Sequence, residues 1–343
     1  MKILIDAMSG DNAPSELLRG AALAAESYPE EILVCGDEAV ILETAKKERI
    51  DLSRLGIVHA PQVIDMEDDA LSAVRSKSDS SMARGLQMLA ENKGDAFVSA
   101  GNTGALVAGA TLIVRKIRGI RRAAIGTVLP FDPPLLLLDS GANIEVLPED
   151  YVQFAQLGSV YMERVFGRRS PRVGLLNNGT EPTKGGKLRT EAHRLLSETA
   201  GINFIGNVEA REVPFSPCDV LVADGFTGNA VLKLSEGLGN FLFGKLKETL
   251  TADFLTKAYA SLLLPKMRRL KREFSASEYG GAPLLGISRP VIKAHGSSDA
   301  EAIKNAVRQA IAVVSSGVIP GMASAATRKS PESKKTEQED GTL

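Results

Sequence analysis

The chain has 343 residues, of which 44% are hydrophobic and 24% are charged, and its formal net charge is −1. A chain of this length can bury a large core, as one large α/β domain or as two closely joined ones. The near-neutral charge gives no overall attraction to nucleic acid, so we expect no nucleic-acid partner and expect any electrostatic recognition to come from local patches.

Short apolar runs alternate along the chain with longer amphipathic segments. Nearly continuous apolar strands are typical of a parallel sheet that helices cover on both faces, so the alternation predicts a doubly wound, mostly parallel α/β/α architecture. The runs predict strands at 2–7, 31–36, 57–61, 95–100, 123–129, 134–140, 172–178, 202–206 and 219–224. The amphipathic segments predict helices at 15–28, 39–48, 79–93, 151–166, 186–200 and 300–314.

Two regions depart from this alternation. From about Asn240 to Phe274 the sequence is helical in character without strands, which predicts a pair of helices that projects from the sheet domain. After Ala326 the chain is polar and has no periodicity, which predicts a disordered tail. We therefore expect a catalytic α/β domain over residues 1–325, a helical excursion within it at 240–274, and a tail at 326–343.

Polar, glycine-containing loops follow most of the predicted strands. In doubly wound folds, ligands bind beyond the carboxyl ends of the strands. Turn formation or helix capping explains any one such loop, but seven at one edge of the sheet favour a shared site. The stretch 99–104 lies between a strand and a helix, where free backbone N–H groups suit a phosphate or an oxyanion. The loops are 6–14, 99–104, 139–143, 177–185, 224–229, 279–283 and 293–298.

Several common catalytic and cofactor motifs are missing from the sequence. No G-x-G-x-x-G follows the first strand, and there is no P-loop or G-x-S-x-G motif. Of the three histidines, His295 lies in a Gly/Ser loop and is the functional candidate, whereas His59 and His193 favour structural or surface roles. Cys35 and Cys218 each lie at an apolar run, which favours buried free thiols and a reducing cytoplasm. We expect no metal and no cofactor.

Eight short stretches, in the same order along the chain, carry a resemblance to a known family. They are DAMSGDNAP, SKSDSSM, VSAGNTGAL, LLDSGAN, GLLNNGTEPTKG, ADGFTGNAVLK, YGGAPLLG and KAHGSS. Over about residues 1–325 the chain resembles the bacterial acyl-ACP:phosphate acyltransferases, the PlsX family, where ACP is the acyl carrier protein. It departs from the usual pattern at Ser9, where the family commonly has glycine, and at Asn178, Thr180 and Pro182.

The resemblance implies an activity, a fold and partners. The activity is transfer of an acyl group from acyl-ACP to inorganic phosphate, early in phospholipid synthesis, with a downstream glycerol-3-phosphate acyltransferase as a further partner. The fold is related to that of phosphate acetyltransferase and the isocitrate dehydrogenase group. The resemblance also implies a homodimer in the cytoplasm that associates peripherally with the inner face of the cell membrane.

The loop residues are compatible with this reaction. Phosphate is itself an oxygen nucleophile and a thiol is a good leaving group, so neither an enzyme nucleophile nor a strong base is required. Our hypothesis is that Lys184 with Asn178 offsets the charge of phosphate or of the oxyanion; the alternative for Lys184 is a solvated loop lysine. Ser99, Gly101, Asn102, Thr103 and Gly104 form the anion cradle, Asp224 and Asn229 orient it, and His295 with Ser297 and Ser298 completes it.

Two basic stretches suit acidic partners, although a solvated helix face is the alternative for each. Arg115, Lys116, Arg118, Arg121 and Arg122 are expected to contribute to ACP docking. The segment 254–272 places apolar residues beside cationic ones, which suits an in-plane anchor on an anionic bilayer; dimer packing is the alternative. Its expected anchor residues are Leu262, Leu263, Leu264, Arg268 and Arg269.

Three other functions compete with this interpretation. A CoA-dependent phosphate acetyltransferase has the same fold. A metal-dependent hydroxyacid dehydrogenase also has it and needs clustered carboxylates, a role that Asp6, Asp11, Asp139 and Asp224 could be taken to fill. A non-catalytic scaffold for lipid enzymes would have no reason to carry seven polar glycine loops.

Overall fold

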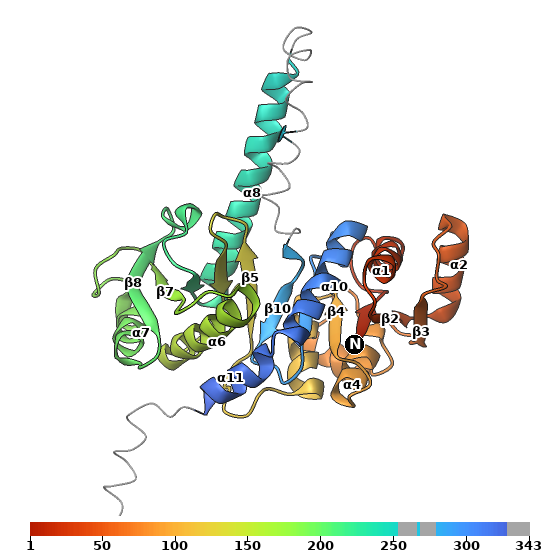
Figure 1. The fold of residues 1–343 in the computed structure, drawn as a ribbon, viewed down its shortest axis with the longest axis horizontal. Helices are drawn as coiled ribbons and strands as arrows, with labels where there is room; N and C mark the ends of the chain where they lie inside the picture. Colours follow the sequence, from red (N-terminus) through yellow and green to blue (C-terminus); the bar gives the residue numbers. More distant parts are fainter. Residues whose placement is uncertain (253–265, 268–278, 328–343) are drawn as a thin grey trace, which may run out of the picture.

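The computed structural model describes residues 1–252, 266–267 and 279–327, and within them an eleven-stranded sheet forms the centre of the molecule (Figure 1). The nine predicted strands are confirmed, with boundaries shifted by a few residues. They are β1 (Lys2–Asp6), β2 (Glu31–Gly36), β3 (Leu55–His59), β4 (Ala96–Ser99), β5 (Ala124–Leu129), β6 (Leu135–Leu138), β7 (Arg172–Asn177), β8 (Asn203–Glu209) and β9 (Val220–Val222). Two short strands were missed, β10 (Ala282–Leu285) and β11 (Val291–Lys293).

The helices cover both faces of the sheet, and the six predicted ones are confirmed. Buried apolar residues of α1, α6, α7 and α10 pack against one face, while α4 and α5 cover the other face of the first half. The helices are α1 (Ser15–Ser27), α2 (Glu38–Glu48), α3 (Ala70–Ser76), α4 (Ser81–Ala90), α5 (Thr103–Gly109), the π-helical η1 (Ala110–Val114), α6 (Pro148–Phe166), α7 (Gly186–Glu198), the short η2 (Val213–Phe215), α8 (Gly225–Leu250), α10 (Ala300–Ser315) and α11 (Val318–Ala326).

The core is mostly aliphatic, because only 5% of the residues are aromatic. All four leucines of β6 are fully buried, because the strand has neighbours in the sheet and apolar clusters on both faces. Cys35 and Cys218 are buried free thiols, as expected, and burial raises the pKa of Cys35 to about 12. Neither thiol is therefore ionised near neutral pH, so neither has the thiolate that nucleophilic chemistry needs.

The two halves of the sheet run in opposite directions. The strand order is β3-β2-β1-β4-β11-β10-β5-β6-β9-β7-β8. The first five strands are parallel to one another, and so are the last four. Between them, β10 is antiparallel to β11 and to β5, and β5 is antiparallel to β6. The expectation that all seven loops converge on one edge of the sheet is therefore wrong, although the sheet is mostly parallel as predicted. The stretch 279–283 leads into β10 and includes the first two residues of that strand.

The loops of the two halves nevertheless reach the same level, because the second half is shifted along the strand direction. The last residue of β6 lies about level with the penultimate residue of β4, although the two strands point in opposite directions. The carboxyl ends of the two halves thus overlap at the middle of the sheet. The backbone pairs that set this level are Leu138 with Gly126, Ile125 with Leu284, Pro283 with Ile292, and Ile292 with Val98.

The helical excursion begins earlier than the predicted start at 240. Helix α8 starts at Gly225 and projects from the sheet as one 26-residue helix (Figure 1). The stretch 224–229, predicted as a loop, is the N-cap and first turn of this helix, and the glycines at 225 and 228 obscured its start. Most of the expected second helix, the five predicted anchor residues and the tail from 328 lie outside the described residues.

Over the part of the chain that the structure describes, no single helix is both long and apolar enough to cross a membrane. Only α10 and α11 taken together, with a bend of 56° between them, meet that test of length and composition.

Candidate functional site

The loops that follow β1, β4 and β11 are tied together at the carboxyl edge of the first half. Ser99 Oγ donates a hydrogen bond to Asp6 Oδ2 at 2.7 Å. Asn12 Nδ2 donates to the backbone carbonyl oxygens of Ser297 and Ser298 at 3.1 and 3.2 Å. Three of the predicted substrate-binding residues, Ser99, Ser297 and Ser298, are therefore brought to one place from positions far apart in the sequence.

The predicted anion cradle lies at a helix start, as expected. Asn102 caps α5, its Oδ1 accepting from the backbone N–H three residues on at 3.0 Å, and Thr103 and Gly104 form the first turn. Gly101 is buried, and a Cβ atom there would lie 2.6 Å from the Cβ of Ser9. Ser9 Oγ is itself buried, and no hydrogen-bond partner for it is found within the described residues. The backbone here approaches closely enough that Gly101 has no room for a side chain.

Three basic side chains gather beside these loops. Lys293, at the end of β11, donates from Nζ to the carbonyl oxygen of Ala100 at 3.1 Å. Burial lowers the pKa of Lys293 to about 8; two nearby aspartates oppose this shift and the charge of Lys233 adds to it. Lys233 lies on α8, and its Nζ is 3.3 Å from Nε2 of His295. The other ring nitrogen of His295, Nδ1, is 2.9 Å from Ser297 Oγ. The contact between Lys233 and His295 joins the two halves of the molecule, and the two lysines favour an anionic ligand.

A hydrogen-bond network fixes the start of α8 in the second half. Asp224 is buried and caps the helix, accepting from the backbone N of Thr227 at 2.8 Å. The same carboxylate accepts from Arg189 Nη2 at 2.7 Å and from the Tyr151 hydroxyl at 3.3 Å. Burial, followed by the charge of Asp224, raises the pKa of Tyr151, which keeps that hydroxyl protonated. Asp224 has its hydrogen-bonding capacity filled by protein groups, so it orients its neighbours.

The other predicted catalytic residues of the second half are exposed. The backbone carbonyl of Lys184 accepts from Asn177 Nδ2 at 3.1 Å, and Asn178 N donates to Asn177 Oδ1 at 2.9 Å. Asn229 lies in the first turns of α8, where its Cβ is 3.8 Å from the position that a Cβ at Gly141 would take. Within the described ranges, no hydrogen bond or ion pair connects Lys184 or Asn178 with the first-half loops.

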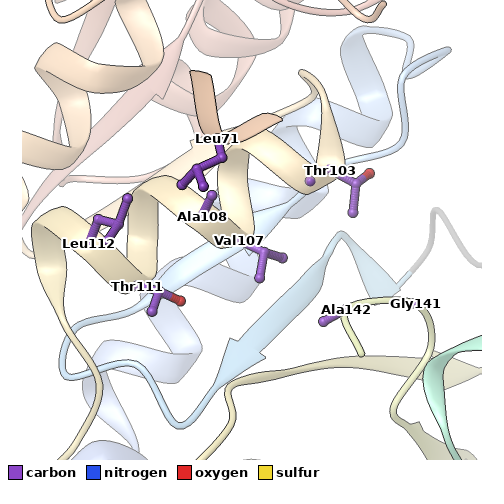
Figure 2. Close-up of a pocket in the computed structure, with 9 residues that line it drawn as sticks. Leu71, Thr103, Val107, Ala108, Thr111, Leu112, Gly141 and Ala142 are labelled. Carbon is purple, nitrogen blue, oxygen red and sulfur yellow. The ribbon is translucent and has the colours of Figure 1, made fainter. Parts of the chain in front are cut away.

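A pocket of about 300 Å³ lies where the loops of the two halves approach each other. Figure 2 shows Val107 and Thr111 of the helical segment α5–η1 directed toward the space in front of the loop that carries Ala142. This pocket therefore adjoins both the anion cradle and the loop after β6. Its lining residues are Leu71, Thr103, Gly104, Val107, Ala108, Thr111, Leu112, Gly141 and Ala142.

The predicted ACP-docking segment is only partly free to bind a partner. Arg121 and Arg122 lie 3.6 and 3.4 Å from the carboxylate oxygens of buried Asp150, so part of their charge is offset within the molecule. Arg115 and Arg118 are exposed and form no ion pair in the part of the chain that the structure describes.

Three of the four aspartates considered for a metal-dependent dehydrogenase, Asp6, Asp139 and Asp224, accept hydrogen bonds from different groups. Asp6 binds Ser99, Asp224 binds Arg189, and Asp139 accepts from backbone N–H groups of its own loop. Among the residues described, no three His, Cys, Asp or Glu side chains gather so that they could hold a metal ion.

Sequence reasoning missed three residues that the structure places at the site. Lys293 opens the quoted stretch KAHGSS, and Lys233 follows Asn229 by one helical turn in ADGFTGNAVLK. Arg189 lies in the predicted helix 186–200 and reaches Asp224 from there. A signal was present for Lys233, because residues four apart share a helix face once α8 is known to start at 225.

Comparisons with known proteins agree on a family and a fold. A family model described as "Fatty acid synthesis protein" matches residues 1–320. A phosphate acyltransferase of Caldicellulosiruptor bescii is 47% identical, covering 93% of this chain and 96% of its own. One from Geobacillus thermodenitrificans is 48% identical, covering 93% and 97%. The structure of the EutD phosphotransacetylase from Staphylococcus aureus matches with a TM-score of 0.61 at 16% identity, and the match covers 92% of this chain and 94% of that one. At this identity the match shows a shared fold.

Proposed function

This chain belongs to the fatty acid synthesis protein (PlsX) family, and from that premise we propose how its site transfers an acyl group to phosphate. The chain is a phosphate acyltransferase, because relatives with that name are similar to it over most of their length and its own. The finer proposal is that the donor is a fatty acyl thioester of ACP and the acceptor is inorganic phosphate.

The reaction balances without a group covalently attached to the enzyme. A phosphate oxygen attacks the thioester carbonyl carbon, and the carbonyl electrons move to oxygen to give a tetrahedral oxyanion. That oxyanion collapses, the C–S bond breaks, and the carrier thiolate leaves and takes up a proton. The products are acyl phosphate and free ACP. The protein's task is to hold a dianion against the carbonyl and to stabilise the oxyanion.

The observation that carries this proposal is the contact between Lys233 of the second half and His295 of the first. It places a cationic group, with Lys293 beside it, at the point where the two sets of loops overlap. We assign phosphate binding to these cations and to the turn 99–104. Lys184 and Asn178 act from the second half, while Asp224, with Arg189, holds α8 in position. Asn229 acts from beside Gly141, which lines the pocket.

Replacing Lys184 with alanine tests the assignment from the second half. We expect kcat/KM for phosphate to fall by about 10²-fold, the usual effect of losing one stabilising donor. The assay is phosphate-dependent release of free ACP from acyl-ACP. Lys187→Ala is the matched control, because Lys187 is an exposed lysine at the start of the next helix. Wild-type kcat/KM for phosphate in Lys184→Ala would remove Lys184 from the site.

The runner-up activity is CoA-dependent phosphate acetyl transfer, which the fold likeness to phosphotransacetylases brings forward. The two differ in the donor that the enzyme prefers. A kcat/KM that is higher for acetyl-CoA than for a long-chain acyl-ACP would favour the runner-up.

The remaining proposals concern partners and location. We propose that 1–325 acts as one catalytic unit, that Arg115 and Arg118 lead ACP docking, and that the enzyme works as a homodimer at the inner face of the membrane. A downstream glycerol-3-phosphate acyltransferase would then receive the acyl phosphate. The segment 254–272 is the proposed anchor, and vesicle flotation of Leu263→Glu tests it: an unchanged membrane-bound fraction would contradict an anchor.

A further inference from the structure

We propose that the pocket beside the helical segment α5–η1 holds the acyl chain of the donor and thereby sets the preferred chain length. This inference rests on the proposed function, because it requires an acyl thioester as donor. The pocket has a volume of about 300 Å³. Such a volume is at the lower end of the range for small-molecule sites in proteins, as expected for a narrow chain.

One face of a helical segment forms the long wall of this pocket. Five of the lining residues occupy positions i, i+3, i+4, i+7 and i+8, so they lie in one stripe along α5–η1. At a rise of 1.5 Å per residue, the stripe from the first of them to the last is about 12 Å long. The wall is therefore elongated along the helix, which suits an extended alkyl chain. The five residues are Gly104, Val107, Ala108, Thr111 and Leu112.

The head of the pocket coincides with the proposed reaction centre. Thr103 and Gly104 belong both to the pocket lining and to the helix start in the anion cradle. Gly141, on the opposite wall, is adjacent to Asn229. A thioester carbonyl that lies next to phosphate in the cradle therefore has its alkyl chain at the head of this pocket.

The chemistry of the lining favours an alkyl chain over the prosthetic arm of the carrier. Among the described residues that line the pocket, Thr103 and Thr111 supply the side-chain hydroxyls, and none is charged or carries a side-chain amide. The prosthetic arm carries amide groups, and burying an amide without a hydrogen-bond partner is costly. An alkyl chain has no such groups and gains by leaving water.

The test is a chain-length profile for three variants. Ala108→Phe fills the middle of the pocket, and Leu112→Ala lengthens its far end. Ala39→Phe is the matched control, because Ala39 is exposed on α2, beside the sheet edge formed by β3. The assay is phosphate-dependent thiol release from a series of saturated acyl-ACP donors, from acetyl to stearoyl, together with KM for phosphate.

The expected results differ between short and long donors. In the wild type, kcat/KM rises by about fourfold per methylene until the pocket is full, equivalent to about 0.8 kcal/mol for each buried methylene. Ala108→Phe lowers kcat/KM for the longest donors by at least about tenfold relative to acetyl-ACP, and Leu112→Ala moves the optimum to longer chains. Ala39→Phe keeps the wild-type profile, and KM for phosphate stays unchanged in all three.

Two outcomes would overturn the inference. One is an equal loss for all donors in Ala108→Phe, which would place the carrier's arm in the pocket. The other is a wild-type profile in both pocket variants. Leu112→Ala decides alone if Ala108→Phe does not fold. A wild-type enzyme that releases no thiol in response to phosphate, with any donor, would instead refute the proposed function, so the two failures are distinguishable.

Discussion

The pH dependence of the reaction should report on Lys293. Its amine is largely buried, and that burial lowers its pKa to about 8. A group with this pKa is about 90% protonated at pH 7 and about 10% protonated at pH 9, so kcat/KM for phosphate should fall by about tenfold between these values if the ammonium binds phosphate. The sign follows from the charge: the cationic form binds the dianion, and it is lost as the pH rises.

Bound phosphate should shift the alkaline fall in activity to higher pH. A phosphate dianion next to the amine favours the charged form and raises its pKa. Because kcat/KM reports the free enzyme and kcat reports the substrate complex, the alkaline fall of kcat should lie at higher pH than that of kcat/KM. Both profiles are measured by phosphate-dependent thiol release, after subtraction of thioester hydrolysis without enzyme.

Two substitutions at this position separate charge from structure. Lys293→Met should lower kcat/KM at pH 7 by about 10²-fold and abolish the alkaline fall. Lys293→Arg should retain more activity and also lose the fall, because arginine stays protonated throughout. If Lys293→Met keeps both the wild-type kcat/KM and the wild-type fall near pH 8, the amine plays no part in the reaction.

Two further predictions concern the close helix contact and the docking surface. Gly228→Ala should lower the free energy of unfolding in urea by about 1–3 kcal/mol, because its Cβ would lie 1.9 Å from a backbone oxygen of the loop after β6. Gly237→Ala is the control, because its Cβ would have no neighbour within 4 Å among the residues that the structure describes. Its stability should rise by up to about 1 kcal/mol, and an equal loss in both variants would contradict the contact argument. Arg115→Glu combined with Arg118→Glu should raise KM for acyl-ACP and reduce its salt dependence, with KM for phosphate unchanged. Exposed Arg169→Glu should do neither, and unchanged ACP kinetics in the double variant would exclude this docking surface.

Much of the fold could be predicted because it is encoded locally. Strands such as β6, buried on both faces, read as unbroken apolar runs, and the helices show their amphipathic period. One part of the reversal of strand direction is local, because the five residues between β5 and β6 are too few for a parallel crossover. The antiparallel pairing of β10 could not be predicted. β10 and β11 are four and three residues long and lie among glycines and prolines, so their pairing is set by tertiary contacts rather than by local pattern.

The candidate site also has one part that could be predicted from the sequence and one part that could not. The cap at Asn102 was predictable, because a polar residue before an apolar run is a local signal. The cationic group was not, since Lys233 and His295 are 62 residues apart and Lys293 acquires its low pKa only through burial. Lys184 and Asn178 were selected from their loop alone, and their part in the reaction remains a prediction.

The join between the two halves of the sheet sets how the proposed phosphate-binding residues of one half lie relative to those of the other. The halves are joined along an antiparallel seam in which β10 and β5 share only two paired positions, Leu284 with Ile125 and Leu285 with Ala124. Gly126 sits at this seam, and a Cβ there would press on three leucine side chains at 3.2–3.5 Å. We expect a larger side chain at this seam to change the angle between the two halves of the sheet. Such a change would alter the distance between Lys233 and His295, which is 3.3 Å in the structure.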